Sequence, residues 1–156
     1  MAAKKIFIAS SSEAIPYAKS FTAGCRNQKL ISYVSWWEVF RAGRTLIEEL
    51  ERFKKELHGA ILIMTPDCKA TVRRKQKHIP NLNVLFEFGY FFGAFPRENV
   101  AIVKYGDVYL PSDLDGYIPI YGGPDYDRKR KIKKGPVPSA RTKKEFFRWV
   151  GNLEKP

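Results

Sequence analysis

Ala60-Ile61-Leu62-Ile63-Met64 is an uninterrupted apolar run of strand length, and it decides the fold class of this 156-residue chain. A strand with one face in water alternates apolar and polar residues, whereas a strand covered on both faces does not. This run therefore predicts the central strand of a parallel sheet that has helices on both faces.

Strand-like and helix-like patterns alternate on either side of this run. Upstream, the sequence predicts strands at 4–10 and 31–36 and helices at 15–27 and 45–57. Downstream, we expect a polar, basic loop over 66–80, a buried helix over 83–93, strands at 100–103 and 117–121, a turn at 111–114 and a closing helix at 142–153. The closing helix has Phe146, Phe147, Val150 and Leu153 on one stripe.

Strands separated by helices favour right-handed βαβ units. We therefore predict an α/β fold with a parallel five-stranded sheet, ordered 2-1-3-4-5 as in flavodoxin-like folds, and helices on both faces. The expected division is a nucleotide-binding domain over 1–125 and a basic tail with a closing helix over 126–156. Within that tail, 128–140 contains Pro136 and Pro138 and is predicted not to bury enough apolar surface to order itself.

The formal net charge of +12 comes from two short stretches. Residues 69–77 and 128–144 are rich in Lys and Arg and contain no acid, and without them the charges of the chain nearly balance. Basic runs of this kind indicate a solvated linker or a nonspecific patch for nucleic acid. The charge therefore does not by itself define the function.

Several classes of protein are excluded by the remaining composition. The N-terminal residues lack the apolar stretch of a secretory signal, which predicts a cytoplasmic protein. No apolar run approaches the roughly 20 residues that span a bilayer, so no membrane association is expected. Cys25, Cys68, His58 and His78 have no metal-ligand spacing, so neither a metal nor a bound cofactor is expected.

Glu87 is the candidate for chemistry, because it is the only acidic or basic residue between Asn83 and Phe95. A carboxylate among phenylalanines is costly unless it is paired or used. Two structural alternatives stay open on helix periodicity alone: Glu87 can occupy an exposed stripe of its helix, or accept hydrogen bonds from the backbone of a neighbouring loop.

Five motifs in order along residues 5–121 resemble one known family, the bacterial TIR-like predicted nucleotide-binding domains of antiphage defence proteins. They are Phe7-Ile8-Ala9-Ser10-Ser11-Ser12-Glu13, Trp37-Glu38-Val39-Phe40 with Gly43-Arg44-Thr45-Leu46, Leu62-Ile63-Met64-Thr65-Pro66-Asp67, Asn83-Val84-Leu85-Phe86-Glu87-Phe88-Gly89-Tyr90 and Leu110-Pro111-Ser112-Asp113-Leu114-Asp115-Gly116. In that family such domains are fused to STING-like, SAVED or cyclic-nucleotide-binding sensors. The resemblance implies that a sensor outside this chain regulates it.

The resemblance also implies an NAD⁺ glycohydrolase in which Glu87 is the catalytic residue and NAD⁺ is the substrate. Cleavage of the nicotinamide–ribose bond develops positive charge on the ribose, which a nearby carboxylate stabilises. Ordinary glycosidases need a second carboxyl group to protonate the leaving oxygen. Nicotinamide leaves a pyridinium cation as a neutral molecule, so one carboxylate suffices.

Six further residues are expected around this substrate, each with a structural alternative. Ser10 and Ser11 end the first strand and would receive the diphosphate, or cap a helix. Trp37 and Phe40 would stack on a ring of the substrate, or pack in the core. Asn83 would bind the ribose or Glu87, or act as an N-cap, and Asp67 would reach the cleft or form an Asx turn.

Two other functions stay open. An apolar helix carrying Phe-Glu-x-Gly-Tyr also resembles that of nucleoside deoxyribosyltransferases, in which the glutamate is a nucleophile. A non-catalytic interaction or nucleic-acid-binding module is the second, on the basis of the basic run at 128–134. For the enzyme we expect self-association through TIR-like domains to raise activity, with the loop at 38–44 as the contact.

Overall fold

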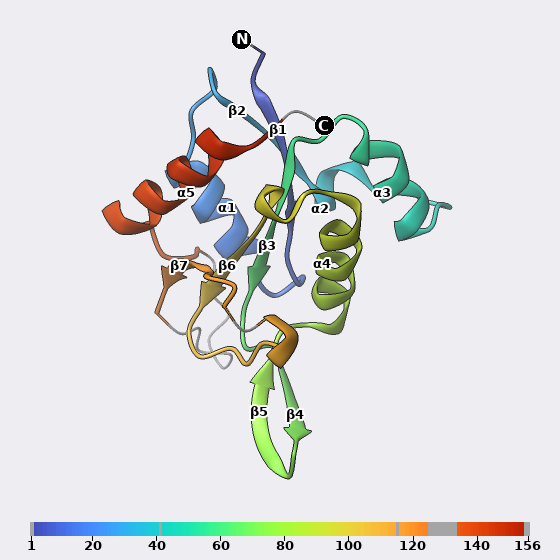
Figure 1. Ribbon diagram of the computed structural model, residues 1–156, viewed down its shortest axis with the longest axis vertical. Helices are drawn as coiled ribbons and strands as arrows, with labels where there is room; N and C mark the ends of the chain where they lie inside the picture. Colours follow the sequence, from blue (N-terminus) through green and yellow to red (C-terminus); the bar gives the residue numbers. More distant parts are fainter. Residues whose placement is uncertain (1, 41, 115, 125–133, 155–156) are drawn as a thin grey trace.

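The computed structural model describes residues 2–40, 42–114, 116–124 and 134–154 (Figure 1). One parallel sheet forms its centre, in the order β2 (Ile31–Ser35), β1 (Lys4–Ala9), β3 (Gly59–Met64), β6 (Val100–Tyr105) and β7 (Ile120–Gly123). Counted within this sheet alone, the order is the expected 2-1-3-4-5. The α/β class is confirmed, and every residue of β3 is buried.

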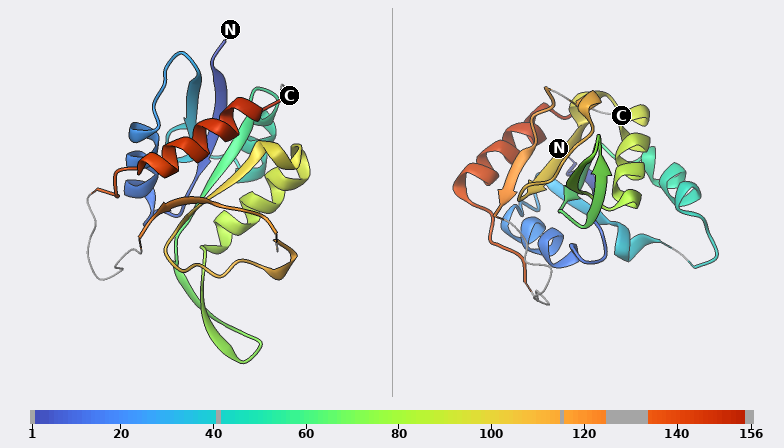
Figure 2. Two further views of the ribbon diagram at one scale, coloured as in Figure 1. Left: turned by 60° about the vertical axis from the view of Figure 1, so that its left-hand side comes forward. Right: turned by 90° about the horizontal axis from the view of Figure 1, so that it is seen from below.

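Helices cover both faces of the sheet (Figures 1 and 2). On one face, Ile6, Ile8, Ile61 and Ile63 pack with residues of α1 (Ile15–Gly24) and α5 (Ala140–Asn152). The alternate residues Phe7, Ala9, Leu62 and Met64 pack on the other face with α3 (Leu46–Lys54) and α4 (Leu82–Ala94). Because strand side chains alternate between faces, an all-apolar strand needs both layers.

The prediction of a loop over 66–80 is wrong. This segment forms an antiparallel hairpin of β4 (Cys68–Val72) and β5 (Lys75–Ile79), which projects beyond the sheet in Figure 1. Its two-residue turn is Arg73-Arg74, with φ of 48° and 65°. Hairpin turns with two positive φ angles usually contain Asn or Gly. The sequence therefore carries no turn signal at this position.

Several boundaries also differ from the expectations. The first helix ends at Gly24, and the second strand ends at Ser35 because Trp36 starts a short helix, α2 (Trp36–Val39). The expected contact loop at 38–44 thus begins inside α2, and its Arg41 lies outside the described residues. The turn at 111–114 contains the 3-10 helix η2 (Ser112–Leu114), and a further 3-10 helix, η1 (Arg97–Asn99), precedes β6.

The closing helix is confirmed as α5, whose Phe146 and Val150 lie in the core. Most of the basic run at 128–134 lies outside the described residues. The expectation that 128–140 does not order itself is wrong for its described part: the Gly135 amide donates to the Pro16 carbonyl (3.3 Å), and the Pro138 ring packs against Gly24. Contact with α1 supplies the apolar surface that this segment lacks. The domain boundary at 125 stays a prediction.

Candidate active site

A small pocket lies at the carboxyl end of β1, between the loop that follows it and the starts of α2, α3 and α4. Its volume is about 170 Å³, and its lining consists of Ser10, Ser11, Ser12, Trp36, Phe40, Leu46, Asn81, Asn83 and Glu87. The chain leaves β1 for α1 on one face and reaches α4 from β3 on the other, so the sheet changes winding direction here. Open α/β sheets bind ligands at such a switch point.

Glu87 lies in this pocket and is only 5% exposed. Val84, Phe88 and Phe91 bury the same side of α4 in the core and thereby hold the Glu87 side chain inward. Its Oε2 atom is buried and has no hydrogen-bond partner among the described residues. Burial raises the pKa of the Glu87 carboxyl to about 7. At neutral pH, Glu87 is therefore protonated in some molecules and ionised in others.

Ser10 and Ser11 are buried at the end of β1, as expected for pocket residues. The Ser10 hydroxyl accepts a hydrogen bond from the indole of Trp36 (3.1 Å), and the Ser11 hydroxyl accepts one from the Ala14 amide (3.2 Å). Ser11 thus also holds the turn before α1, whose N-cap Ala14 has no side-chain cap of its own. Both serines thus line the pocket, but neither caps α1, and their binding of the diphosphate stays a prediction.

Of the two aromatic candidates, Phe40 lines the pocket and Trp37 does not. Trp37 packs against the core on the α1 side of the sheet. Its neighbour Trp36 takes the position in the pocket, because α2 starts at that residue and turns the two indoles apart (interplanar angle 86°). Helix periodicity from Trp36 onward was the signal that would have separated these two residues.

Asn83 lines the pocket, but Asp67 does not. The N-cap of α4 is Asn81, whose side chain accepts from the Asn83 amide (2.9 Å), so the capping role belongs to Asn81. The Asp67 carboxylate accepts a hydrogen bond from the Thr65 hydroxyl (2.8 Å). This is a contact between two side chains, whereas an Asx turn needs a backbone donor, so the Asx turn stays a prediction.

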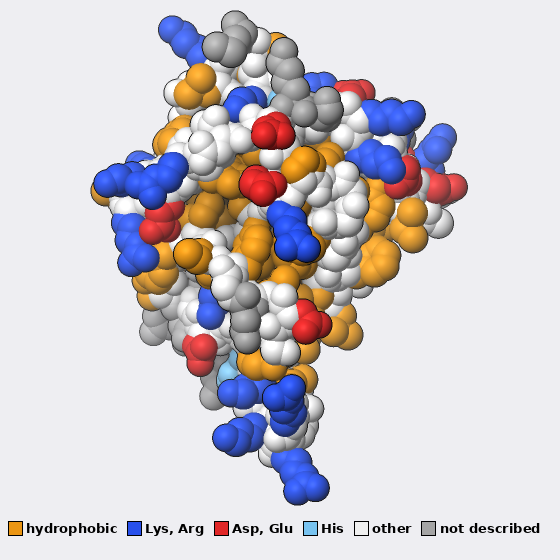
Figure 3. All heavy atoms as spheres, in the orientation of Figure 1, with side chains coloured by type: hydrophobic (Ala, Val, Ile, Leu, Met, Phe, Trp, Pro, Cys, Tyr) orange, Lys and Arg blue, Asp and Glu red, His pale blue; other side chains and the backbone are white. Residues whose placement is uncertain are grey.

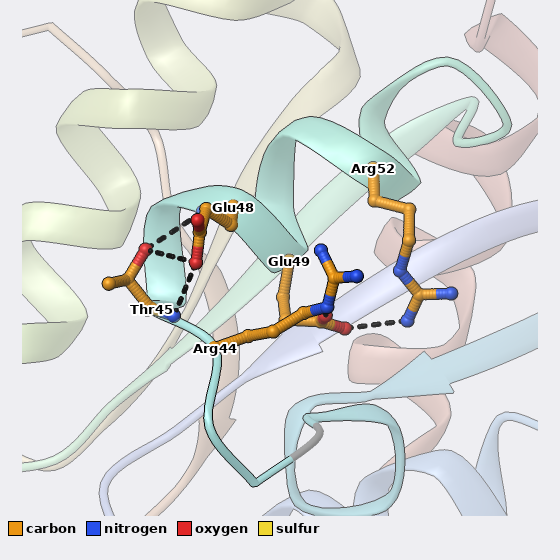
Figure 4. A network of polar contacts seen from close by, with 5 residues as sticks. All are labelled: Arg44, Thr45, Glu48, Glu49 and Arg52. Atoms are coloured by element: carbon orange, nitrogen blue, oxygen red, sulfur yellow. Dashed lines mark hydrogen bonds and ion pairs between the residues drawn. The ribbon is translucent and has the colours of Figure 1, made fainter.

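The rim formed by α3 is fixed by two polar arrangements (Figure 4). Thr45 and Glu48 form a capping box at the start of the helix, which places Leu46 at the pocket. Glu49, 1% exposed, contacts the guanidinium groups of Arg52 (2.6 Å) and Arg44 (3.6 Å). Glu49 was not singled out in the sequence, because an acid in an amphipathic helix resembles any solvated residue.

A larger cavity of about 520 Å³ lies between β5 and the segment joining β6 to β7. Lys77, Lys104, Asp107 and Tyr109 are among its lining residues, and none of the acids and bases among its described lining residues is buried. The smaller pocket is the better candidate because it combines a buried carboxylate with serines at the switch point. Among the described residues, no group of three or more His, Cys, Asp or Glu side chains forms a metal site.

No helix in the described part of the chain is both long and apolar enough to cross a membrane. In a comparison with known families, residues 5–122 match the family described as CAP12/Pycsar effector protein, TIR domain. The matched residues run from Lys5 in β1 to Gly122 in β7 and include the residues that line the pocket.

Named relatives agree with this match. Pycsar effector protein PaPycTIR of Pseudomonas aeruginosa is 38% identical over 115 residues, covering 71% of this chain and 37% of that protein. CD-NTase-associated protein 12 of Sphingobacterium faecium is 31% identical over 113 residues (72% and 34%), and protein tirC of Dictyostelium discoideum is 40% identical over 88 residues (49% and 44%). The chain thus spans between a third and a half of the length of these relatives.

Proposed function

The chain belongs to the TIR-domain family of CAP12/Pycsar effector proteins, and from this membership we propose that it is an NAD⁺ glycohydrolase of antiphage defence, with Glu87 as its catalytic residue. One observation carries the proposal: a buried carboxylate without a basic partner among the described residues lies in a pocket at the switch point of the sheet. Perturbed carboxyl groups in clefts are candidates for catalysis.

The reaction needs little more than this group. The bond between ribose C1′ and the nicotinamide nitrogen breaks, and its electron pair neutralises the pyridinium ring. Water adds to C1′, and one proton passes to solvent, which yields nicotinamide and ADP-ribose. The Glu87 carboxylate stabilises the positive charge that develops on the ribose, and the surrounding apolar groups strengthen this interaction by excluding water.

The pocket suits the nicotinamide riboside end of the substrate. Its 170 Å³ is below the roughly 300–1,000 Å³ typical of pockets that enclose a whole ligand. Trp36 and Phe40 offer aromatic surface for the nicotinamide ring, and the hydroxyls of Ser10 and Ser11 offer hydrogen bonds to the ribose. The ADP half then lies outside the pocket, where a second copy of the domain would contribute contacts. Self-association is therefore part of the proposal, as is a sensor domain or protein outside this chain.

The test is Glu87→Gln, with Glu98→Gln as a control that removes the same charge from an exposed position at the opposite edge of the sheet. Nicotinamide release from NAD⁺ should fall by about 10²–10³-fold in Glu87→Gln, because the transition-state charge loses its stabilising partner. It should be unchanged in Glu98→Gln. Measuring both over a hundredfold range of protein concentration adds a test of self-association, since the rate per molecule should rise with concentration.

A folded Glu87→Gln protein that cleaves NAD⁺ at the parental rate would remove Glu87 from the mechanism. The same assay with a deoxynucleoside tests the deoxyribosyltransferase alternative. Base release from the deoxynucleoside, with NAD⁺ left intact, would replace the proposed substrate while keeping the catalytic role of Glu87.

A further inference from the structure

The β4–β5 hairpin is a strongly basic element that stands apart from the rest of the domain. It projects from the end of the molecule opposite the chain termini, and Lys and Arg side chains gather over it (Figures 1 and 3). Lys69, Arg73, Arg74 and Lys75 are exposed, and none of them has an ion-pair partner among the described residues. Lys77 lies over the ring of Tyr109 (5.6 Å). The four exposed cations are therefore available to bind a partner.

The turn at the tip places two of these cations where the backbone disfavours them. Arg73 and Arg74 are the only non-glycine residues with positive φ in the described part of the chain, at 48° and 65°. A two-residue turn with both φ angles positive favours Asn-Gly, since side chains with a Cβ atom are strained there. Strained positions concentrate at functional sites. The identity of these residues is thus better explained by their guanidinium groups than by the turn.

The pairing of the strands distributes charge over both faces of the hairpin. Cross-strand partners share a face, so Lys75 and Lys77 lie with Val72 and Ala70, whereas Lys69 lies on the other face with His78. A protein interface usually has an apolar or aromatic centre and few lysines. A hairpin with cations on both faces and at its tip is instead suited to a groove that has negative charge on both walls.

We propose that the β4–β5 hairpin binds the phosphate backbone of double-stranded nucleic acid. The major groove accepts a two-stranded ribbon, and phosphates border it on both sides. Arginine donates paired hydrogen bonds to phosphate oxygens, which suits the two guanidinium groups at the tip. Because the contacts reach phosphates and sugars, the binding is independent of sequence. This function is separate from NAD⁺ cleavage and uses none of the residues of the Glu87 pocket.

The test is the double variant Arg73→Asn/Arg74→Gly, which gives the turn its preferred residues while removing two charges. The matched control is Arg26→Gln/Lys29→Gln, which removes two exposed charges from the connection between α1 and β2, at the opposite edge of the sheet. All proteins keep the basic run at 128–134. Binding to a fluorescent 20-base-pair duplex of mixed sequence is measured by anisotropy at several salt concentrations, beside a thermal melt.

The hairpin variant should bind the duplex about ten- to a hundredfold more weakly at low salt, and its slope of log affinity against log salt should be shallower by roughly 2. The control should bind within about twofold of the parent protein, because its charges lie far from the duplex. The melt of the hairpin variant should hold or rise. Weakened binding in a variant that is at least as stable cannot be attributed to unfolding.

Three results would overturn the proposal. The first is a hairpin variant that binds the duplex as the parent does, and the second is a control that loses as much as the hairpin variant. The third comes from a fluorescent polyglutamate peptide used as the second probe. If it binds as tightly as the duplex and loses affinity equally in the hairpin variant, the partner is an acidic protein surface.

Discussion

Glu87 and Glu49 are both buried glutamates on helices that cover the same face of the sheet, yet their surroundings differ. Glu49 contacts two arginines, at 2.6 Å and 3.6 Å (Figure 4), although its Oε1 atom, like Oε2 of Glu87, has no hydrogen-bond partner among the described residues. Glu87 has no basic partner in the described part of the chain, and burial raises the pKa of its carboxyl to about 7. Burial alone therefore does not distinguish a structural from a catalytic carboxylate.

The two carboxylates are distinguished by whether a compensating positive charge lies beside them. The arginines offset the cost of burying Glu49, so this residue stabilises the start of α3. The cost of burying Glu87 is not offset in this way, and the group faces a pocket instead of packed protein. Ionisation of such a carboxylate destabilises the fold. A cost of this kind is expected of a residue that is retained for chemistry.

The largest expected effect comes from exchanging the two residues for glutamine. Glu87→Gln should lose about 10²–10³-fold of the NAD⁺ cleavage rate and should melt no lower than the parent at pH 8. Glu49→Gln should retain turnover per folded molecule but lose about 1–3 kcal/mol of stability, a value reduced because its arginine partners are partly exposed. Nicotinamide release and thermal melts of both variants check the pair. Loss of stability in Glu87→Gln alone would reverse the two roles.

A second expectation concerns pH. The unfolded chain ionises Glu87 near its ordinary pKa, and the folded chain does so near 7. Protonated Glu87 therefore stabilises the folded protein by roughly 3 kcal/mol, as given by the shift in pKa. This stabilisation is complete below the ordinary pKa of glutamate and is lost as pH rises to about 7. Denaturation of parent and Glu87→Gln between pH 4.5 and 8 measures it as a growing advantage of the variant. A constant difference across this range would contradict the raised pKa.

The cleavage rate should change in the opposite direction. Only the ionised carboxylate stabilises the developing cation, so kcat/KM should rise with pH through a midpoint of about 7. The parallel profile of Glu49→Gln should keep the same midpoint, because Glu49 does not line the pocket. A midpoint near the ordinary pKa of glutamate would show that Glu87 is paired in the working enzyme.

The smallest expected effect tests the walls of the pocket. Trp36→Phe removes the hydrogen bond to Ser10 and should raise KM about 2- to 10-fold, as expected for one neutral hydrogen bond. Trp37→Phe should leave KM unchanged, because that indole packs on the other side of the sheet and its buried nitrogen has no hydrogen-bond partner among the described residues. Steady-state kinetics of both variants decide between them, and equal changes in KM would place both indoles in the pocket.

The sequence by itself determined the layers of the fold. The apolar run at 60–64 and the alternation of strand and helix patterns predicted a parallel sheet covered on both faces, because periodicity directly reports which faces are buried. The same reasoning singled out Glu87, since one charged residue in an apolar helix is detectable without any knowledge of its neighbours. The motifs around it supplied the expected chemistry.

Only the tertiary structure decided what each of these residues contacts. The sequence did not show that Glu49 meets two arginines, that Trp36 and not Trp37 enters the pocket, or that residues 66–80 form a hairpin. These outcomes depend on helix starts, turn conformations and distances between segments far apart in the chain. Local pattern reports burial, whereas the balance of charge at a buried site is a property of several segments together, and only folding brings them into contact.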